Sequence, residues 1–180
     1  MKRIVALFML SIMVLFVLGC GNDKYNDSKI LPNEMPEDFS FTISWGVFGK
    51  SSYNSKTGIL VKTTDATNPD DYITSYNLSN YEMKCIYNML CELHMESYPN
   101  EMDEKDFVMS DPYCKYSLSV ECDGFSKTIT ANYVGIPYLE ESAGKTKKAK
   151  KYLETIDEIV EILTGTDEWK ALPDYEFLYY

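Results

Sequence analysis

The sequence is poor in the residues that catalysis and metal binding require. Its 180 residues include one histidine, His94, so no histidine cluster can hold a metal and at most one imidazole can act as a base. It contains no G-x-S-x-G nucleophile motif and no glycine-rich phosphate loop. The acidic stretches 65–71 and 101–106 lack the alternate spacing and the glycine of a calcium loop. We therefore expect no catalytic residue, no metal site and no cofactor.

Positive charge is also scarce. The chain has 17 lysines and arginines against 28 aspartates and glutamates, which gives a formal net charge of −11. An acidic surface repels nucleic acid, because contacts between cationic side chains and phosphates dominate the affinity of nucleic-acid-binding proteins. We expect no nucleic-acid partner. The length suits a single domain, and 15 tyrosines and eight phenylalanines supply material for its core.

A long apolar run stands at the N-terminus. Lys2 and Arg3 precede an apolar stretch from Ile4 to Leu18 that only Ser11 interrupts. A membrane-spanning helix needs about 20 apolar residues, so this stretch is too short for a comfortable span. A short positive segment followed by an apolar core of this length is typical of a signal peptide.

The apolar run ends at Val17-Leu18-Gly19-Cys20, which resembles the lipobox of bacterial prolipoproteins. In that family the cysteine thiol is diacylated and signal peptidase II cuts before the cysteine. The resemblance implies that residues 1–19 are a signal peptide, that cleavage falls between Gly19 and Cys20, and that Cys20 carries the lipid. Removing residues 1–19 takes away two cations and no acid, so the net charge changes from −11 to −13 over 161 residues.

This resemblance implies a protein anchored by lipid to the extracytoplasmic face of the cell membrane, with membrane lipid as a partner through Cys20. Two or three acyl chains make such an anchor stable. The rest of the chain is similar to small uncharacterised lipoproteins of Gram-positive gut bacteria, a resemblance that carries no functional residue. Residues 20–38 are polar and contain two prolines, so we expect a tether there. Residues 39–180 then form a single domain.

Hydrophobic periodicity predicts an α+β domain. Alternating apolar residues predict strands at 39–47, with a bend near Gly46 and a continuation through Tyr53, and at 59–64 and 72–78. A capping box at Ser79 to Glu82 predicts the start of a helix that Pro99 ends.

The C-terminal half predicts a hairpin and a second helix. That helix spans about 147–163, with Gly165 suited to a left-handed cap and a further turn at 167–172. We therefore expect an antiparallel sheet of about five strands with two helices packed on one face. The turn Asp123-Gly124 sets the register of the hairpin, and the other face of its strands is wholly polar. The pairs on the mainly apolar face are Cys122 with Phe125, Val120 with Lys127, Leu118 with Ile129, Tyr116 with Ala131 and Cys114 with Tyr133.

Four cysteines remain in the mature chain, and none has the spacing of a zinc site or a C-x-x-C motif. Cys114 and Cys122 lie about 26 Å apart on one strand, which is too far for a disulfide. Cys85 and Cys91 lie on different sides of one helix and cannot bond either. A disulfide, where one forms, therefore joins Cys91 to Cys114 or Cys122 and leaves Cys85 free. The alternative is that all four thiols stay reduced.

Two surface features are candidates for interaction. The first is a lysine cluster at the N-terminal end of the second helix, where the helix dipole disfavours cations. It would contact anionic lipid or wall polymer, or else form a solvated face with pairs such as Lys150–Glu154. The second is the aromatic tail, which could be a binding strip, pack as an edge strand or cover the core. The residues concerned are Lys147, Lys148, Lys150, Lys151, Tyr175, Phe177 and Tyr179.

The leading functional hypothesis is a non-catalytic envelope module that binds a protein, a wall polymer or a small ligand. The alternatives are a secreted-side hydrolase or hydrolase inhibitor, and a purely structural envelope lipoprotein. A hydrolase would use Cys91 and His94, which lie three residues apart on the predicted helix. A deep pocket with converging polar groups would favour the enzyme, and a flat sheet with exposed aromatic residues would favour the binding module.

Overall fold

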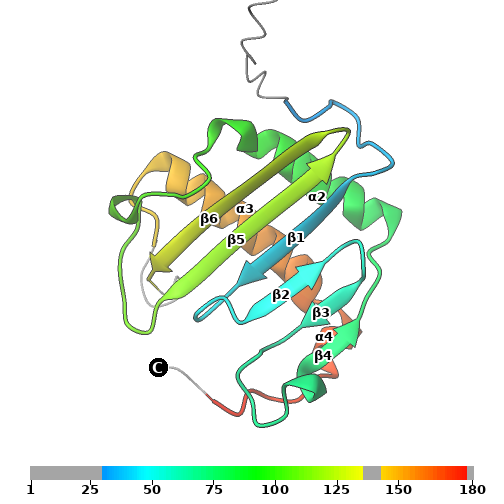
Figure 1. Ribbon diagram of the computed structural model, residues 1–180, viewed down its shortest axis with the longest axis vertical. Coiled ribbons are helices and arrows are strands. Elements are labelled where there is room, and N and C mark those ends of the chain that lie inside the picture. Colours follow the sequence, from blue (N-terminus) through cyan, green and yellow to red (C-terminus); the bar gives the residue numbers. More distant parts are fainter. Residues whose placement is uncertain (1–29, 136–142, 178–180) are drawn as a thin grey trace, which may run out of the picture.

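The computed structural model describes residues 30–135 and 143–177 and contains a six-stranded antiparallel sheet in the order β4-β3-β2-β1-β5-β6 (Figure 1). The two long helices, α2 and α3, lie together on one face of this sheet. The α+β prediction is confirmed. The elements are β1 (Ser40–Trp45), β2 (Ser51–Asn54), β3 (Ile59–Val61), β4 (Ile73–Ser75), α2 (Asn80–Leu93), β5 (Cys114–Cys122), β6 (Phe125–Val134), α3 (Lys147–Thr164) and α4 (Asp167–Lys170), with short 3-10 turns η1 (Pro69–Tyr72), η2 (Met95–Ser97) and η3 (Glu104–Asp106).

The sheet has one strand more than expected because the first predicted strand folds back on itself. Gly46, Phe48 and Gly49 all adopt positive φ, at 80°, 56° and 68°. These angles reverse the chain, so that Trp45 of β1 pairs with Ser51 of β2. The expected bend is therefore a hairpin turn.

The β5–β6 hairpin has the predicted register over most of its length. Leu118 pairs with Ile129 and Cys122 pairs with Phe125. At the open end the prediction is wrong, because Cys114 pairs with Val134 instead of Tyr133. A bulge in the ladder between Cys114 and Tyr116 shifts the register there, as an extra residue in one strand does.

The helices begin where the sequence predicts and end differently. The capping box that starts α2 is present, but α2 ends at Leu93 because His94 takes a left-handed conformation with φ 53°. The helix does not continue to Pro99. Gly165 after α3 has φ −71°, so the expected left-handed cap is also wrong, and the chain turns directly into α4.

The domain begins earlier than the sequence suggests. Leu31, expected in the tether, is 5% exposed and belongs to the core. The hydroxyl of Tyr87 donates to the carbonyl oxygen of Pro32 at 2.6 Å, which holds this segment on α2. The packed domain therefore begins at Leu31 instead of Phe39, which leaves ten residues between Cys20 and the domain.

The core lies between the apolar face of the sheet and the two helices. The hydroxyl of Tyr152 on α3 donates to the backbone oxygen of Ile129 on β6 at 3.1 Å, which ties helix to sheet. The opposite face is polar over β5 and β6, and no helix of the described residues covers it (Figure 1). Across residues 30–135 and 143–177, no helix is long and apolar enough to cross a membrane.

Candidate functional site

A groove of about 730 Å³ opens in the helical layer, between the first half of α2 and the junction of α3 with α4. Its volume falls within the range of about 300–1,000 Å³ that is typical of ligand sites. The larger apolar and aromatic side chains in its walls are Tyr76, Tyr81, Met89 and Ile162. The carboxylates in its walls are Glu82, Glu161, Asp167 and Glu168.

The α2 wall of the groove is held in place by the capping box. The Glu82 carboxylate accepts hydrogen bonds from the Ser79 backbone at 2.7 Å and from the Tyr76 hydroxyl at 2.7 Å. Burial works against the charge of Glu82, but the bonds from Ser79 and Tyr76 outweigh it and lower the pKa of this carboxyl. The same bond, with burial and the nearby charge, raises the pKa of Tyr76 to about 12. This wall thus presents a fixed anion and a neutral phenol.

The opposite wall combines a helix end with three carboxylates. Glu161 lies in the last turn of α3, after which the Thr166 hydroxyl donates to the Leu163 carbonyl and the Lys170 ammonium donates to the Gly165 carbonyl. Asp167 and Glu168 form the first turn of α4, where the Thr166 hydroxyl caps the backbone of Trp169. No lysine or arginine is among the described residues that line the groove.

A further carboxyl group, Asp157, lies on α3 one turn before Glu161. Its pKa is raised to about 6, mainly by burial and to a lesser extent by the charge of Glu161. The arrangement favours a ligand that brings positive charge into the groove.

A second surface, on the open face of the sheet, was not expected from the sequence. The ring of Tyr113 packs against Phe48 at 4.9 Å and against Tyr133 at 4.6 Å between centroids. Tyr133 is 43% exposed. Phe48 and Tyr133 have φ of 56° and 59°, a region that bulky side chains rarely adopt. The three rings thus form an aromatic cluster beside polar strand positions, which is a feature of binding surfaces.

The predicted lysine cluster lies at the other end of α3 from the groove. Lys147, Lys148 and Lys150 are exposed, and Lys151 is partly buried. The expected Lys150–Glu154 ion pair is not formed, since none of the ion pairs within 4 Å in the described ranges involves these lysines. The structure therefore keeps the cluster apart from the groove.

The aromatic tail does not form the edge strand that was one expectation. Tyr175 and Phe177 are 41% and 50% exposed, and Tyr179 lies outside the described residues. The tail is attached near the β3–β4 edge, where the Tyr72 hydroxyl donates to the Asp174 carbonyl at 2.9 Å. The ammonium group of Lys62 lies 5.1 Å from the centre of the Tyr175 ring. The tail is thus an exposed strip over one edge of the sheet.

The residues of the hydrolase alternative are not brought together. His94 follows the last residue of α2, and its left-handed conformation turns the imidazole outward, where Nδ1 lies 3.6 Å from Glu96. The Cys91 thiol instead faces the Pro32 carbonyl oxygen at 3.8 Å, and burial raises its pKa. Over the described ranges, no three His, Cys, Asp or Glu side chains are grouped as a metal site would require.

The four cysteines that the structure describes are free thiols, and two of them lie near one another. The pKa of Tyr87 is raised by burial and by the proximity of both Cys91 and Cys122. The pKa of Cys122 is raised by burial, by two neighbouring carboxyl groups and by Cys91. Cys114 lies at the far end of β5, about 26 Å along the strand. The structure therefore favours Cys122 over Cys114 as the neighbour of Cys91.

We expect that mild oxidation of the folded protein links Cys91 to Cys122, and that Cys85 reacts first with iodoacetamide. Burial raises the pKa of Cys91, Cys114 and Cys122, and only the thiolate reacts. Peptide mapping after each treatment measures both outcomes. A Cys85–Cys91 peptide from the oxidised sample would contradict helix α2, and a Cys91–Cys114 peptide would contradict the assignment of neighbours.

Gly19 and Cys20, the predicted cleavage and lipidation residues, lie outside the described residues. Comparison with known proteins finds no matching family and no matching curated protein.

Proposed function

We propose that this protein is an exported, lipid-anchored envelope lipoprotein that acts as a non-catalytic binding module, and that its groove binds a cationic ligand. The observation that carries the proposal is the groove between α2 and the α3–α4 junction, with four carboxylates and no cation among its described lining residues. The lipobox resemblance at Cys20 supports the anchor. The ligand class is a basic peptide segment that also carries apolar side chains.

The groove combines the two contacts that such a segment offers. Its carboxylates attract a lysine or arginine side chain with an energy of about 1 kcal/mol per contact in water and more where the pair is shielded. Tyr76 and Met89 add apolar surface for the neighbouring side chains of the ligand. Because exposed charges are screened by salt, the affinity should fall as ionic strength rises.

The alternatives have less support. The hydrolase alternative depended on Cys91 and His94, whose side chains contact different partners. The Cys85 thiol does line the groove, but its side-chain partner there is the Tyr81 hydroxyl, and His94 is not among the described lining residues. A purely structural lipoprotein would bind no ligand in the groove, so the binding experiment separates it from the proposal.

We expect that replacing three groove carboxylates weakens binding of a cationic amphipathic peptide by about 10-fold to 100-fold. The variant is Glu161→Gln/Asp167→Asn/Glu168→Gln. Each lost contact removes about 0.5–1 kcal/mol, and 1.4 kcal/mol is tenfold in affinity. Binding of a fluorescent peptide of alternating lysine and leucine to the purified lipoprotein in detergent micelles is measured by anisotropy.

The matched control is Asp70→Asn/Asp71→Asn/Glu104→Gln, which removes the same net charge from exposed positions outside the groove. We expect this control to change the affinity less than threefold, because screening limits the effect of distant charges. An equal loss in the two variants would mean that net charge alone attracts the peptide. Absence of binding by the unmodified protein would favour the structural alternative.

A further inference from the structure

The N-terminal end of α3 carries a dense group of positive charge in an acidic protein. Five lysines occupy seven successive positions, and the first turn of the helix contains no acidic residue. The positive end of the helix dipole makes this the least favourable place on α3 for cations. Local helix stability therefore does not account for the group. We call it the basic end of α3, and it consists of Lys145, Lys147, Lys148, Lys150 and Lys151.

The structure leaves most of this charge available. Lys145, Lys147 and Lys150 are exposed, and none of the ion pairs within 4 Å in the described residues involves the basic end. Lys148 is held by the domain, since its ammonium group donates to the Ser97 carbonyl and lies 4.5 Å from the centre of the Tyr98 ring.

An acidic segment lies beside the basic end. The backbone N–H of Lys145 donates to the carbonyl of Asp106 at 2.7 Å, next to η3. In that segment the Asp103 carboxylate pairs with Lys105 at 2.8 Å, which also lowers the pKa of Asp103. Part of the local negative charge is therefore already compensated within the segment.

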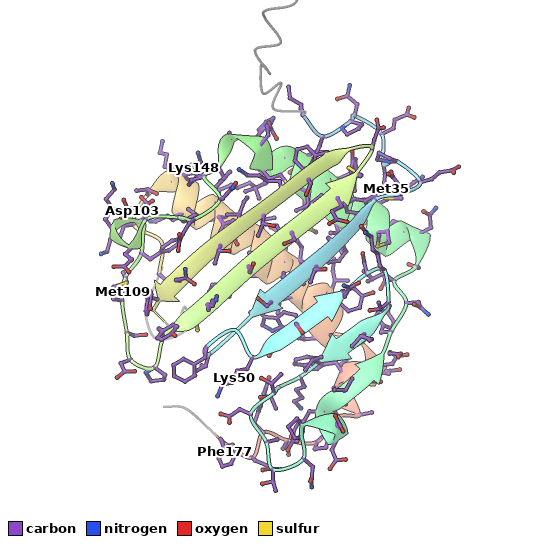
Figure 2. The ribbon with its side chains drawn as sticks, in the orientation of Figure 1. Met35, Lys50, Asp103, Met109, Lys148 and Phe177 are labelled. Atoms are coloured by element: carbon purple, nitrogen blue, oxygen red, sulfur yellow. The ribbon has the colours of Figure 1, made fainter. Side chains whose placement is uncertain are left out.

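The basic end lies at the same end of the molecule as the start of the described chain. Figure 1 shows the chain entering at the top, α3 running from the upper left, and α4 at the lower right. Figure 2 labels Lys148 at the upper left and Met35, in the entering segment, at the upper right. The groove, which α4 helps to form, lies toward the opposite end of α3.

The chain between the lipid and the domain is short. The domain begins at Leu31, so only about ten residues follow Cys20 before the packed structure. Ten residues span at most about 35 Å even when fully extended. This short connection keeps the domain near the bilayer, and anionic headgroups attract the basic end where it comes within about one screening length, about 8 Å at physiological salt.

We propose that the basic end of α3 docks on anionic phospholipid headgroups of the membrane that anchors the chain. The inference rests on the lipid anchor of the proposed function. Positive side chains meet negative headgroups, while the acidic remainder of the domain is repelled by the same surface. Docking by this end turns the α3–α4 groove away from the membrane, toward ligands in the envelope.

The test measures how fast acetic anhydride modifies each lysine of the full lipoprotein in lipid vesicles. The vesicles are pure phosphatidylcholine or phosphatidylcholine with about 30% phosphatidylglycerol. A lysine near an anionic surface gains roughly a fivefold preference for it, so we expect Lys145, Lys147 and Lys150 to react at least threefold more slowly on the anionic vesicles. The rates of Lys56 and Lys170 should be unchanged, and 0.5 M salt should remove the difference.

Two variants distinguish the effect of the basic end of α3 from the effect of net charge. In Lys147→Gln/Lys150→Gln/Lys151→Gln the protection of Lys145 should be lost. In the matched variant Lys56→Gln/Lys84→Gln/Lys170→Gln it should persist. Equal rates on the two vesicle types, or protection that survives the first variant, would overturn the proposal.

Loss of the lipid anchor and loss of docking by the basic end of α3 give different results. Flotation of the protein with pure phosphatidylcholine vesicles reports the lipid anchor alone. The difference in lysine modification rates between the two vesicle types reports docking by the basic end of α3. If these lysines are protected from modification only when an anionic wall polymer is added to neutral vesicles, the basic end of α3 binds that polymer, and docking on lipid is overturned.

Discussion

Leu118→Asp is expected to abolish folding of the domain. Leu118 is fully buried in β5 and pairs with Ile43 of β1 on one side and Ile129 of β6 on the other. Loss of its packing costs about 2–5 kcal/mol, and an unpaired buried carboxylate costs several more. A domain of this kind is stabilised by only about 5–15 kcal/mol, so the folded state does not survive the change.

The neighbouring position is the control. Ser119 lies on the open face of the sheet, where its hydroxyl is 2.8 Å from that of Thr128. Ser119→Asp exchanges one exposed hydrogen bond for a solvated charge, and we expect its melting temperature to fall by less than about 5 °C. Thermal unfolding followed by circular dichroism compares the two variants. Similar melting temperatures would show that the two faces of β5 have been assigned the wrong way round.

The register that this comparison uses was predictable because its determinants are local. Asp123 and Gly124 have φ of 42° and 68°, as the two-residue turn requires, and strict alternation on both sides assigns each residue to a face. The same holds for α2, whose capping box at Ser79 and Glu82 is present. Residues close together in the chain determine these turns and caps, so the sequence alone predicts them.

Features that depend on distant contacts were not predictable. The sequence near Tyr133 does not predict the bulge that pairs Cys114 with Val134, because the bulge depends on how the two strands pair. His94 has the spacing of a buried position, but the chain leaves the helix at that residue. Leu31 stands in a polar, proline-containing stretch, and its burial becomes evident only when α2 is packed against it.

The groove also depends on contacts between residues that are distant in the sequence, so it was not predicted. Tyr76 and Glu82 lie about 80 to 90 residues from Glu161 and Glu168 in the chain. From the sequence alone, each of these residues is interpreted as a solvated or capping residue. The packing of α2 on α3 places both sets of carboxylates on one concavity. The lysine cluster was found from the sequence because its members are adjacent in the chain, whereas its distance from the groove required the fold.

Cys20→Ala is expected to abolish incorporation of labelled palmitate in the native host and to leave residues 1–19 on the chain or release the protein from the membrane. In the prolipoproteins that residues 17–20 resemble, the cysteine thiol is the only site of acyl transfer before cleavage. The remaining thiols belong to the folded domain, where burial raises the pKa of Cys91, Cys114 and Cys122. Cys85→Ala is the matched control and should be labelled and processed as the unmodified chain is.

The measurement is autoradiography of membrane and soluble fractions, with the mass of the purified protein reporting cleavage. Loss of label together with a retained N-terminal segment would support a lipobox that ends at Cys20. Undiminished label in Cys20→Ala would refute the anchor, and with it the orientation that brings the basic end of α3 to the membrane. The groove would remain a candidate binding site, because its four carboxylates belong to the folded domain and not to the tether.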